Sequence, residues 1–211
     1  MVRRKVKIFK LAMISGMLIF LAYVHLLQVI SARRGARMAI CASNLKQIGL
    51  ALHMYLQDYD NWLPPAYCRF CDKYWIEILE PYIFKSISPK QKENPLICPS
   101  DKNHIWRGTN YIYNGYYGFF SDSGYPKNLA YKPRKLSDFK HPEDSLLLMD
   151  GKPDVSPVFT KSNYVFCIDI RHKDMEGINF LYVLYVDGSI RVIKTKKDIN
   201  FLFTENQLYG Y

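Results

Sequence analysis

The first 57 residues of the chain contain no aspartate and no glutamate, and Asp58 is the first acidic residue. The whole chain of 211 residues has 29 Lys and Arg against 19 Asp and Glu, a formal net charge of +10. Nine of the basic residues lie in residues 1–57, which leaves 20 basic and all 19 acidic residues in 58–211, a net charge of +1. The positive charge is therefore an N-terminal feature, and the nearly neutral remainder gives no reason to expect a nucleic-acid partner.

The chain also lacks the short motifs that mark common catalytic and nucleotide-binding sites. It contains no Gly-x-Ser-x-Gly, no Gly-x4-Gly-Lys-Ser/Thr, no His-Glu-x2-His and no Gly-x-Gly-x2-Gly. Five cysteines are too few for a scaffold held together mainly by disulfides, and 49% hydrophobic residues exclude a disordered chain. We therefore expect a folded, non-enzymatic protein without a bound cofactor.

No charged residue interrupts Leu11–Ile30, a run of 20 residues. As a helix this run spans about 30 Å, the thickness of the hydrocarbon core of a bilayer. Five basic residues precede it and three follow it. The positive-inside rule then keeps the N-terminus cytoplasmic and sends residues 33–211 across the membrane. We expect residues 1–32 to form a basic tip and an uncleaved anchor; a cleaved signal peptide, which usually has a shorter apolar region, is the alternative.

After the anchor, apolar residues recur at alternating steps of three and four, and no proline occurs in residues 11–63. This spacing predicts an amphipathic helix over residues 33–60, continuous with the anchor. Asp60-Asn61 and Pro64-Pro65 end it. We expect its apolar stripe to pack against the protein's own sheet. The stripe consists of Met38, Cys41, Leu45, Ile48, Leu52, Tyr55 and Tyr59.

The head, residues 33–211, continues with a loop-rich region over residues 61–144 and a β-sheet with a C-terminal tail over 145–211. Aromatic and β-branched runs predict the strands, and Asp187-Gly188 predicts a two-residue type I′ hairpin turn. A helix on an antiparallel sheet with long loops is an α+β fold. The predicted strands are Ser145–Met149, Tyr164–Ile168, Ile178–Val186 and Ser189–Ile193.

Several segments carry a resemblance to a known family. In chain order they are Cys41–Pro65 (CASNLKQIGLALHMYLQDYDNWLPP), Trp75–Ile83 (WIEILEPYI), Cys98–Asp101 (CPSD), Asn110–Gly115 (NYIYNG), Leu146–Gly151 (LLLMDG), Arg171-His172 and Val186–Gly188 (VDG). Together they resemble bacterial pilin-like proteins related to type II secretion pseudopilins. These proteins have a prepilin-type N-terminal helix, a Cys-Pro-Ser-Asp turn and a C-terminal His followed by Asp-Gly. The corresponding signature residues here are Cys98, Asp101, Asp150, Gly151, His172, Asp187 and Gly188.

The resemblance implies a long N-terminal helix whose first half spans the bacterial inner membrane, with the head outside the cytoplasm. It also implies partners, either other pilin-like subunits or a secretion platform. The processing site departs from the family's Gly followed by Phe-Thr-Leu-Ile-Glu, because Ile8 stands in place of the Gly and Met13 in place of the Glu. In pilins that Glu is thought to neutralise a neighbouring subunit's N-terminal amine, which Met13 cannot do. A minor subunit or a monomeric membrane-tethered binding module therefore fits better than a major fibre subunit.

The cysteines leave a metal-binding or redox alternative open. Cys68-x2-Cys71 with Cys98 and His104 could supply four zinc ligands, but oxidation to disulfides competes outside the cytoplasm. Cys41 lies on the helix stripe, where it could pack in the core or pair with a cysteine of the head. Cys-x2-Cys follows Pro64-Pro65 in a loop, which disfavours a thioredoxin-like site.

Two further candidate sites use the acidic residues of the head. Asp150, Asp154 and Asp187 could supply oxygen ligands to calcium, although no calcium-loop motif is present. His172 with Asp187 or Asp150 could form an acid–base pair, and the alternative is a histidine that only hydrogen-bonds a loop. The spacing of 14 residues between His172 and Asp187 is wider than in the pilin-like signature.

Overall fold

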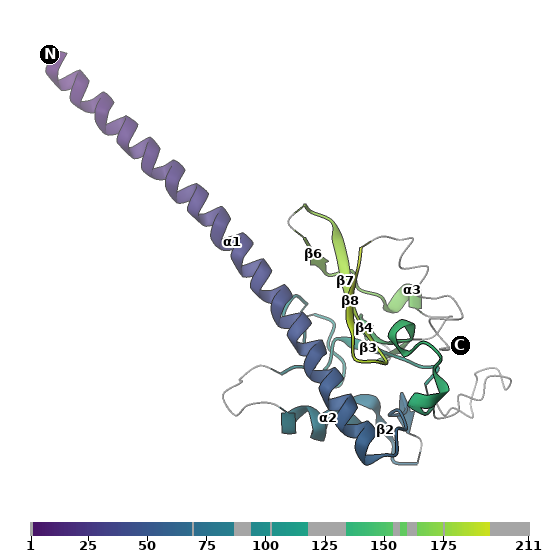
Figure 1. Ribbon diagram of the computed structural model, residues 1–211. Helices are drawn as coiled ribbons and strands as arrows, with labels where there is room; N and C mark the ends of the chain where they lie inside the picture. Colours follow the sequence, from purple (N-terminus) through teal and green to yellow (C-terminus); the bar gives the residue numbers. More distant parts are fainter. Residues whose placement is uncertain are drawn as a thin grey trace. The chain divides into compact units, whose positions relative to one another are not determined.

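The computed structural model describes residues 2–68, 70–86, 94–101, 103–117, 134–153, 157–159, 164–174 and 176–194. Its first element is α1 (Val2–Asp58), a helix of 57 residues. The chain divides into two compact units, Met1–Arg37 and Met38–Tyr211, and α1 contributes to both (Figure 1). The prediction of one long N-terminal helix that ends near Tyr59 is confirmed.

In the first unit, the apolar side chains of α1 are uncovered. Phe9, Ile19 and Leu26 are 66%, 71% and 55% exposed. An 18-residue window of the helix has a mean hydropathy of 2.0, and none of it is buried. A core helix of a soluble protein would bury such side chains, so this unit is consistent with the predicted single-pass membrane anchor.

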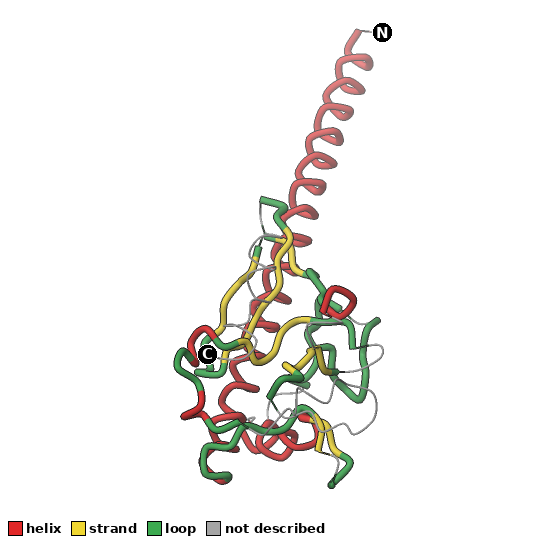
Figure 2. Tube along the Cα trace, turned by 90° about the vertical axis from the view of Figure 1, so that its right-hand side faces the viewer, coloured by secondary structure: helices red, strands yellow, loops and turns green. Residues whose placement is uncertain are grey.

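In the second unit, the remainder of α1 packs against the head. The inner residues of the predicted stripe are buried, whereas Met38 is half-buried and Tyr59 is 50% exposed. The strands of the sheet lie alongside this part of the helix (Figures 1 and 2). Gly49 permits the close approach, because a Cβ there would lie 3.3 Å from Leu184. The buried stripe residues are Cys41, Leu45, Ile48, Leu52 and Tyr55.

The main sheet has six strands in the order β5-β3-β4-β7-β6, and β8 pairs with β7. A smaller sheet joins β1 to β2 and leads into α2. The predicted α+β class is confirmed. The helices and strands after α1 are β1 (Tyr67–Cys68), β2 (Lys73–Tyr74), α2 (Trp75–Ser86), β3 (Tyr111–Asn114), η1 (Leu136–Asp138), η2 (Pro142–Asp144), β4 (Leu146–Asp150), β5 (Val158–Phe159), α3 (Tyr164–Cys167), β6 (His172–Lys173), β7 (Asn179–Tyr185) and β8 (Ile190–Ile193).

Two details of the predicted sheet are wrong. The sheet is mixed and not purely antiparallel, because β5 pairs parallel with β3. The segment Tyr164–Ile168 contains the short helix α3 and not a strand. Its aromatic and β-branched residues favour a strand, but β4 already has β3 on one side and β7 on the other. Only an isolated bridge remains, between Ile168 and Gly151.

The β7–β8 connection is a hairpin, but it is not the predicted two-residue turn. The Tyr185 N–H donates to the Ser189 carbonyl and the Gly188 N–H donates to the Tyr185 carbonyl, so the loop has three residues. Gly188 has φ +82°, whereas Asp187 is not in the positive-φ region that a type I′ turn requires at both positions. A Cβ on Gly188 would also lie 2.6 Å from Nε2 of His53 on α1.

We expect Gly188→Ala to destabilise the protein through both effects. Gly108 is a matched control, because it has φ +81° and no atom within 4 Å of an added Cβ. Gly108→Ala should cost only the conformational part, about 1–2 kcal/mol. Gly188→Ala should cost slightly more, because the added Cβ meets only the tip of the His53 side chain, which can shift, and His53→Ala in the same chain should remove the excess. Chemical denaturation of the full-length protein in detergent measures these differences. Equal losses at the two glycines would show that the contact with His53 contributes nothing.

Candidate functional site

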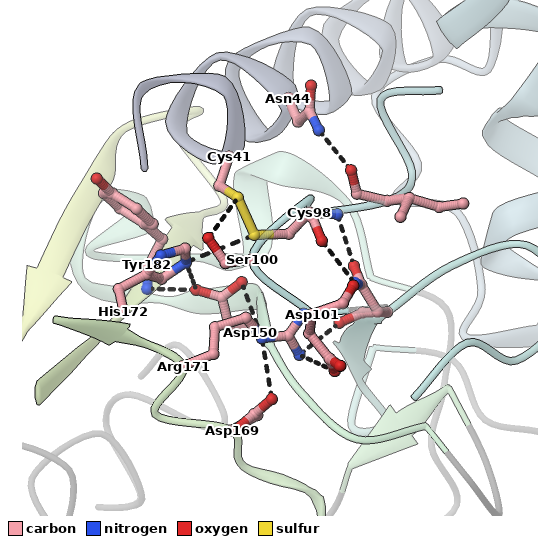
Figure 3. The surroundings of a disulfide bond; sticks show 12 residues. Cys41, Asn44, Cys98, Ser100, Asp101, Asp150, Asp169, Arg171, His172 and Tyr182 are labelled. Atoms are coloured by element: carbon pink, nitrogen blue, oxygen red, sulfur yellow. Dashed lines mark hydrogen bonds and ion pairs between the residues drawn. A yellow bond between two sulfur atoms is a disulfide. The ribbon is translucent and has the colours of Figure 1, made fainter. Parts of the chain in front are cut away.

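Five of the seven signature residues meet in one buried polar cluster beside α1. Figure 3 labels four of them, Cys98, Asp101, Asp150 and His172. The five residues arrive on three separate segments. Cys98 and Asp101 come from the turn before β3, Asp150-Gly151 from the end of β4, and His172 from the start of β6. The other two, Asp187 and Gly188, lie in the β7–β8 loop, where the Asp187 carboxylate accepts the Ser189 N–H at 2.8 Å.

A disulfide connects α1 to this cluster. Cys41 and Cys98 are both fully buried, and their Cα atoms are 4.8 Å apart. Almost one helical turn further along, the Asn44 side chain donates to the Ile97 carbonyl at 2.8 Å. A covalent bond and a partly buried hydrogen bond therefore attach the same face of α1 to the turn before β3.

Asp150 closes a gap in the hydrogen bonding of β7. β4 pairs with β7 as far as Met149 and Val183, and β6 takes over at His172 and Phe180. At the junction, the Asp150 carboxylate accepts the Tyr182 N–H at 2.8 Å. Its second contact is Nε2 of His172, at 3.1 Å. The carboxylate thus replaces a missing strand partner, which gives it a structural role.

Arg171 lies among three carboxylates although its side chain is only 3% exposed. Its Nε is 3.0 Å from Asp169 and 3.8 Å from Asp150, and its Nη2 is 3.8 Å from Asp101. Nη2 also donates to the backbone carbonyls of Asn110 and Gly151. One guanidinium therefore balances part of the negative charge and joins the backbone at Asn110 and at Gly151 to its own segment.

The Cys-Pro-Ser-Asp turn is held by Asn110, the first residue of the Asn- and Tyr-rich segment. The Asn110 side chain accepts the Cys98 N–H at 2.8 Å and donates to the carbonyls of Cys98 and Asp101 at 3.0 and 2.8 Å. These bonds fix the direction of the Asp101 side chain. Its carboxylate accepts the Asn103 N–H and lies 2.9 Å from Nδ1 of His104.

The pKa values of Asp101 and Asp169, two of the carboxylates around Arg171, are shifted in opposite directions. Burial by itself raises the pKa of Asp101, but the hydrogen bonds from Asn103 and His104 and the charge of Arg171 outweigh it, so the pKa is lowered. At Asp169 burial is the largest effect and exceeds the attraction of Arg171, so the pKa is raised. Asp101 is therefore the carboxylate of this pair that stabilises the fold through its charge.

Gly151 is a packing requirement of the same cluster. A Cβ added there would lie 2.5–2.6 Å from three side-chain atoms of Ile112, a fully buried residue of the adjacent strand β3. The Asp-Gly pair at the end of β4 is thus explained residue by residue. Asp150 completes the sheet, and Gly151 lets β3 approach.

The predicted zinc set is not brought together. Cys98 is bonded to Cys41, the His104 ring contacts Asp101, and Cys68 forms a disulfide with Cys71, whose Cα is 5.7 Å away. Two other groups of ligand-type side chains occur among the described residues. In one, Cys41 and Cys98 with His172, both sulfur atoms are already used. In the other, Asp101, His104 and Asp169, the guanidinium of Arg171 faces the carboxylates and opposes a metal cation.

The predicted calcium set does not form among the described residues either, and Asp154 lies outside them. Asp150 is at one end of β4, whereas Leu146, at the other end, pairs with Tyr185 beside the loop that holds Asp187. The histidine therefore pairs with Asp150 and not with Asp187. Because the side chains of His172 and Asp150 are both 0% exposed, this pair is out of reach of a substrate and stabilises the junction of β4 and β6.

Sequence reasoning found most of the cluster but missed Asp169 and the central position of Arg171. The only signal was the spacing Asp169-x-Arg171, which places both side chains on one face of an extended segment. A second feature was also missed, a groove of about 600 Å³ between the end of α1, α2 and the β1–β2 hairpin. Tyr55, Tyr59 and Tyr82 line it together with the Cys68–Cys71 disulfide.

The two disulfides should contribute very differently to stability. Cys41–Cys98 joins residues 57 apart, and Cys68–Cys71 joins residues three apart. We expect Cys41→Ser with Cys98→Ser to lower the free energy of unfolding by about 2–4 kcal/mol, because it frees a long loop in the unfolded chain. Cys68→Ser with Cys71→Ser is the control and should cost much less. Denaturation of both variants in detergent measures the difference, and similar losses would contradict a pinning role for Cys41–Cys98.

Protonation of Asp101 should weaken the fold in acid. A carboxyl whose pKa is lower in the folded than in the unfolded protein adds stability above its unfolded value, about 3.9. That stability is lost as the pH falls through the lower, folded pKa. We expect Asp101→Asn to be less stable than the wild type near neutral pH, with the difference shrinking below about pH 4. Unfolding free energies measured across this range test it; a constant difference would argue against the charge of Asp101.

Residues 30–73 match the model of a family described as a protein of unknown function (DUF1559), a family typical of prepilin-like bacterial proteins. The matched stretch includes the whole buried stripe of α1 and the β1–β2 turn with its disulfide, and it does not reach Ile8 or Met13. No curated protein and no solved structure matches the chain. The comparison thus supports, for this part of the chain, the pilin-like character that the sequence motifs predict.

Proposed function

We propose that the protein is a non-enzymatic, single-pass membrane protein of the pilin-like type, a minor subunit of a type II secretion or type IV pilus-like assembly. The proposal rests on the fact that two stretches of α1 have different surroundings. One stretch of the helix is apolar and uncovered, and a later stretch is buried and disulfide-bonded to a sheet. Such a helix is suited to attach a folded head to a bilayer and to pack beside similar helices.

Charge and cysteine chemistry favour a head outside the cytoplasm of a bacterium, anchored in the inner membrane. Five basic residues precede the apolar run and three follow it, which favours a cytoplasmic N-terminus. Two disulfides in the head fit an oxidising compartment better than a reducing one. These two arguments are independent and give the same orientation.

The departures at Ile8 and Met13 favour a chain that keeps its N-terminus and takes part in assembly in few copies. With Ile8 in the position of the family's Gly, prepilin-type cleavage before Phe9 is disfavoured. With Met13 in the position of the Glu, no carboxylate is available to pair with a neighbour's terminal amine. Lateral contacts of this helix then rest on packing and hydrogen bonds and not on a charge pair at this position.

We expect the protein expressed from this sequence and extracted from membranes to keep the bond between Ile8 and Phe9, with the 24.8 kDa mass of the uncleaved chain. A C-terminal alkaline phosphatase fusion should be active, because the head is expected outside the cytoplasm. A photo-crosslinking residue at Met13 should capture a pilin-like subunit or a second copy, whereas the same residue at Lys46, on the exposed surface of α1, should capture far less.

Each readout tests one element of the proposal. A chain that begins at Phe9 would overturn the retained N-terminus, and an inactive fusion would overturn the orientation. If Met13 gives no crosslink to a pilin-like chain or to a second copy, the subunit role is wrong. The second candidate, a monomeric membrane-tethered binding module, is then favoured, and the groove beside α2 is the observation that supports it.

A further inference from the structure

The groove lies at the C-terminal end of α1, about 30 Å along the helix from Met38. Its walls are the last turn of α1, one face of α2 and the β1–β2 hairpin. Its volume of about 600 Å³ falls in the range of small-molecule sites in proteins. It shares no residue with the buried polar cluster, so the signature residues do not explain it.

Three tyrosines give the groove flat apolar surfaces. The rings of Tyr55 and Tyr59 are stacked, with centroids 4.2 Å apart and planes inclined by 16°. Tyr82 meets Tyr55 edge-on at 5.6 Å. Tyr59 is 50% exposed, although its ring is stacked on Tyr55. A ligand that packs on this ring therefore loses little side-chain conformational entropy of Tyr59. Ligands with flat apolar C–H faces can pack on such a ring.

The polar groups of the groove are mixed and balanced. Asp58 and Glu77 contribute two negative charges, and Lys73 and Lys85 contribute two positive charges. Within the described residues neither lysine lies within ion-pair distance of a carboxylate, whereas Glu77 is paired with Arg107. A polyanion would meet Asp58 and Glu77, and a polycation would meet the lysines. The lining therefore favours an uncharged ligand that both donates and accepts hydrogen bonds.

Two local features add polar groups that suit hydroxyls. The Tyr82 hydroxyl donates to Asp58 at 2.9 Å, and burial together with that neighbouring carboxylate raises the pKa of Tyr82 to about 12, so the phenol stays neutral. Pro81, inside α2, lacks the N–H that would pair with the Glu77 carbonyl, and both residues line the groove. A hydroxyl group can use the lysines, the carboxylate or a freed carbonyl as a partner.

We propose that this groove binds a neutral oligosaccharide, with a sugar ring packed on Tyr59 and its hydroxyls bonded to the lysines and to Asp58. Sugars combine the two properties that the lining selects, apolar C–H faces and many uncharged hydroxyls. A bound peptide would instead use a long strand edge or a continuous apolar groove. The hairpin strands here have only two residues each, and charged side chains interrupt the apolar surface.

The Cys68–Cys71 disulfide holds one wall of the groove, the β1–β2 hairpin, in place. It closes the β1–β2 turn, and both cysteines line the groove. Tyr67 and Tyr74 pack across the same hairpin, with ring centroids 4.7 Å apart. Removal of the disulfide should therefore weaken sugar binding while the core of the head, with its buried Cys41–Cys98 bond, stays folded.

The test is calorimetric titration of the full-length protein in detergent with cellohexaose and chitohexaose, beside oligogalacturonate, hexaglutamate and an oligodeoxythymidine. We expect at least one neutral sugar to bind, with an affinity that hardly changes between about 0.05 M and about 0.5 M salt. Tyr59→Leu should weaken binding roughly tenfold, or about 1.4 kcal/mol. Tyr59→Phe keeps the ring and should bind nearly as the wild type does. Cys68→Ser with Cys71→Ser should weaken binding without lowering the unfolding temperature appreciably.

Three results would overturn the inference. One is no binding of either neutral sugar, and another is unchanged binding by Tyr59→Leu in a protein that remains folded. The third is salt-sensitive binding of the acidic sugar, the peptide or the oligonucleotide in place of the neutral sugars, which would assign the groove to an anionic ligand. None of these results bears on the subunit role, because that role is tested by crosslinking at Met13 and does not involve the groove.

Discussion

The disulfide between Cys41 and Cys98 is the constraint on which the arrangement of the head depends. It fixes α1 to the turn before β3, and that turn supplies Asp101 to the cluster around Arg171. Arg171 in turn bonds the backbone at the end of β4. The helix is therefore bonded covalently to a turn that is itself hydrogen-bonded to the sheet through Asn110 and Arg171.

Two glycines allow the sheet to approach α1 closely, which supports the same packing of α1 against the head. Gly49 lets Leu184 of β7 reach α1, and Gly188 lets the β7–β8 loop pack under His53. Gly49 and His53 both lie on α1, within about three and a half turns of Cys41. The buried stripe, the disulfide and the glycines thus describe one continuous interface. Asp-Gly in the hairpin is part of that interface, and its glycine has a packing reason in addition to its positive φ.

The sequence predicted the elements that local pattern determines, which are the long helix, the central strands β4, β7 and β8, and the hairpin between the last two. Prediction from the sequence failed where the structure of a segment depends on its contacts with distant parts of the chain. Tyr164–Ile168 has strand-forming residues, but it meets the sheet only at the end of β4, where β3 and β7 already occupy both sides of that strand. The sequence offered Asp150 as one of two partners for His172 and a cysteine of the head for Cys41, but it could not choose among the alternatives, because each contact joins segments that are distant in the chain. The Cys-x2-Cys spacing suggested a metal, and the fold placed the other candidate ligands elsewhere.

The two polar regions of the head differ in exposure, because the cluster is buried and the groove is open to solvent, and this difference separates structure from recognition. In the buried cluster, the carboxylates of Asp101 and Asp150 already have donors, and a ligand would have to displace them at the cost of a buried charge. In the groove, Lys73, Lys85 and the exposed face of Tyr59 keep their capacity for contacts, and no core residue has to move. The residues that resemble a family signature therefore maintain the fold. In pilin-like proteins with a similar head, we then expect the residues that determine ligand binding to differ at the end of α1, in the β1–β2 hairpin and in α2.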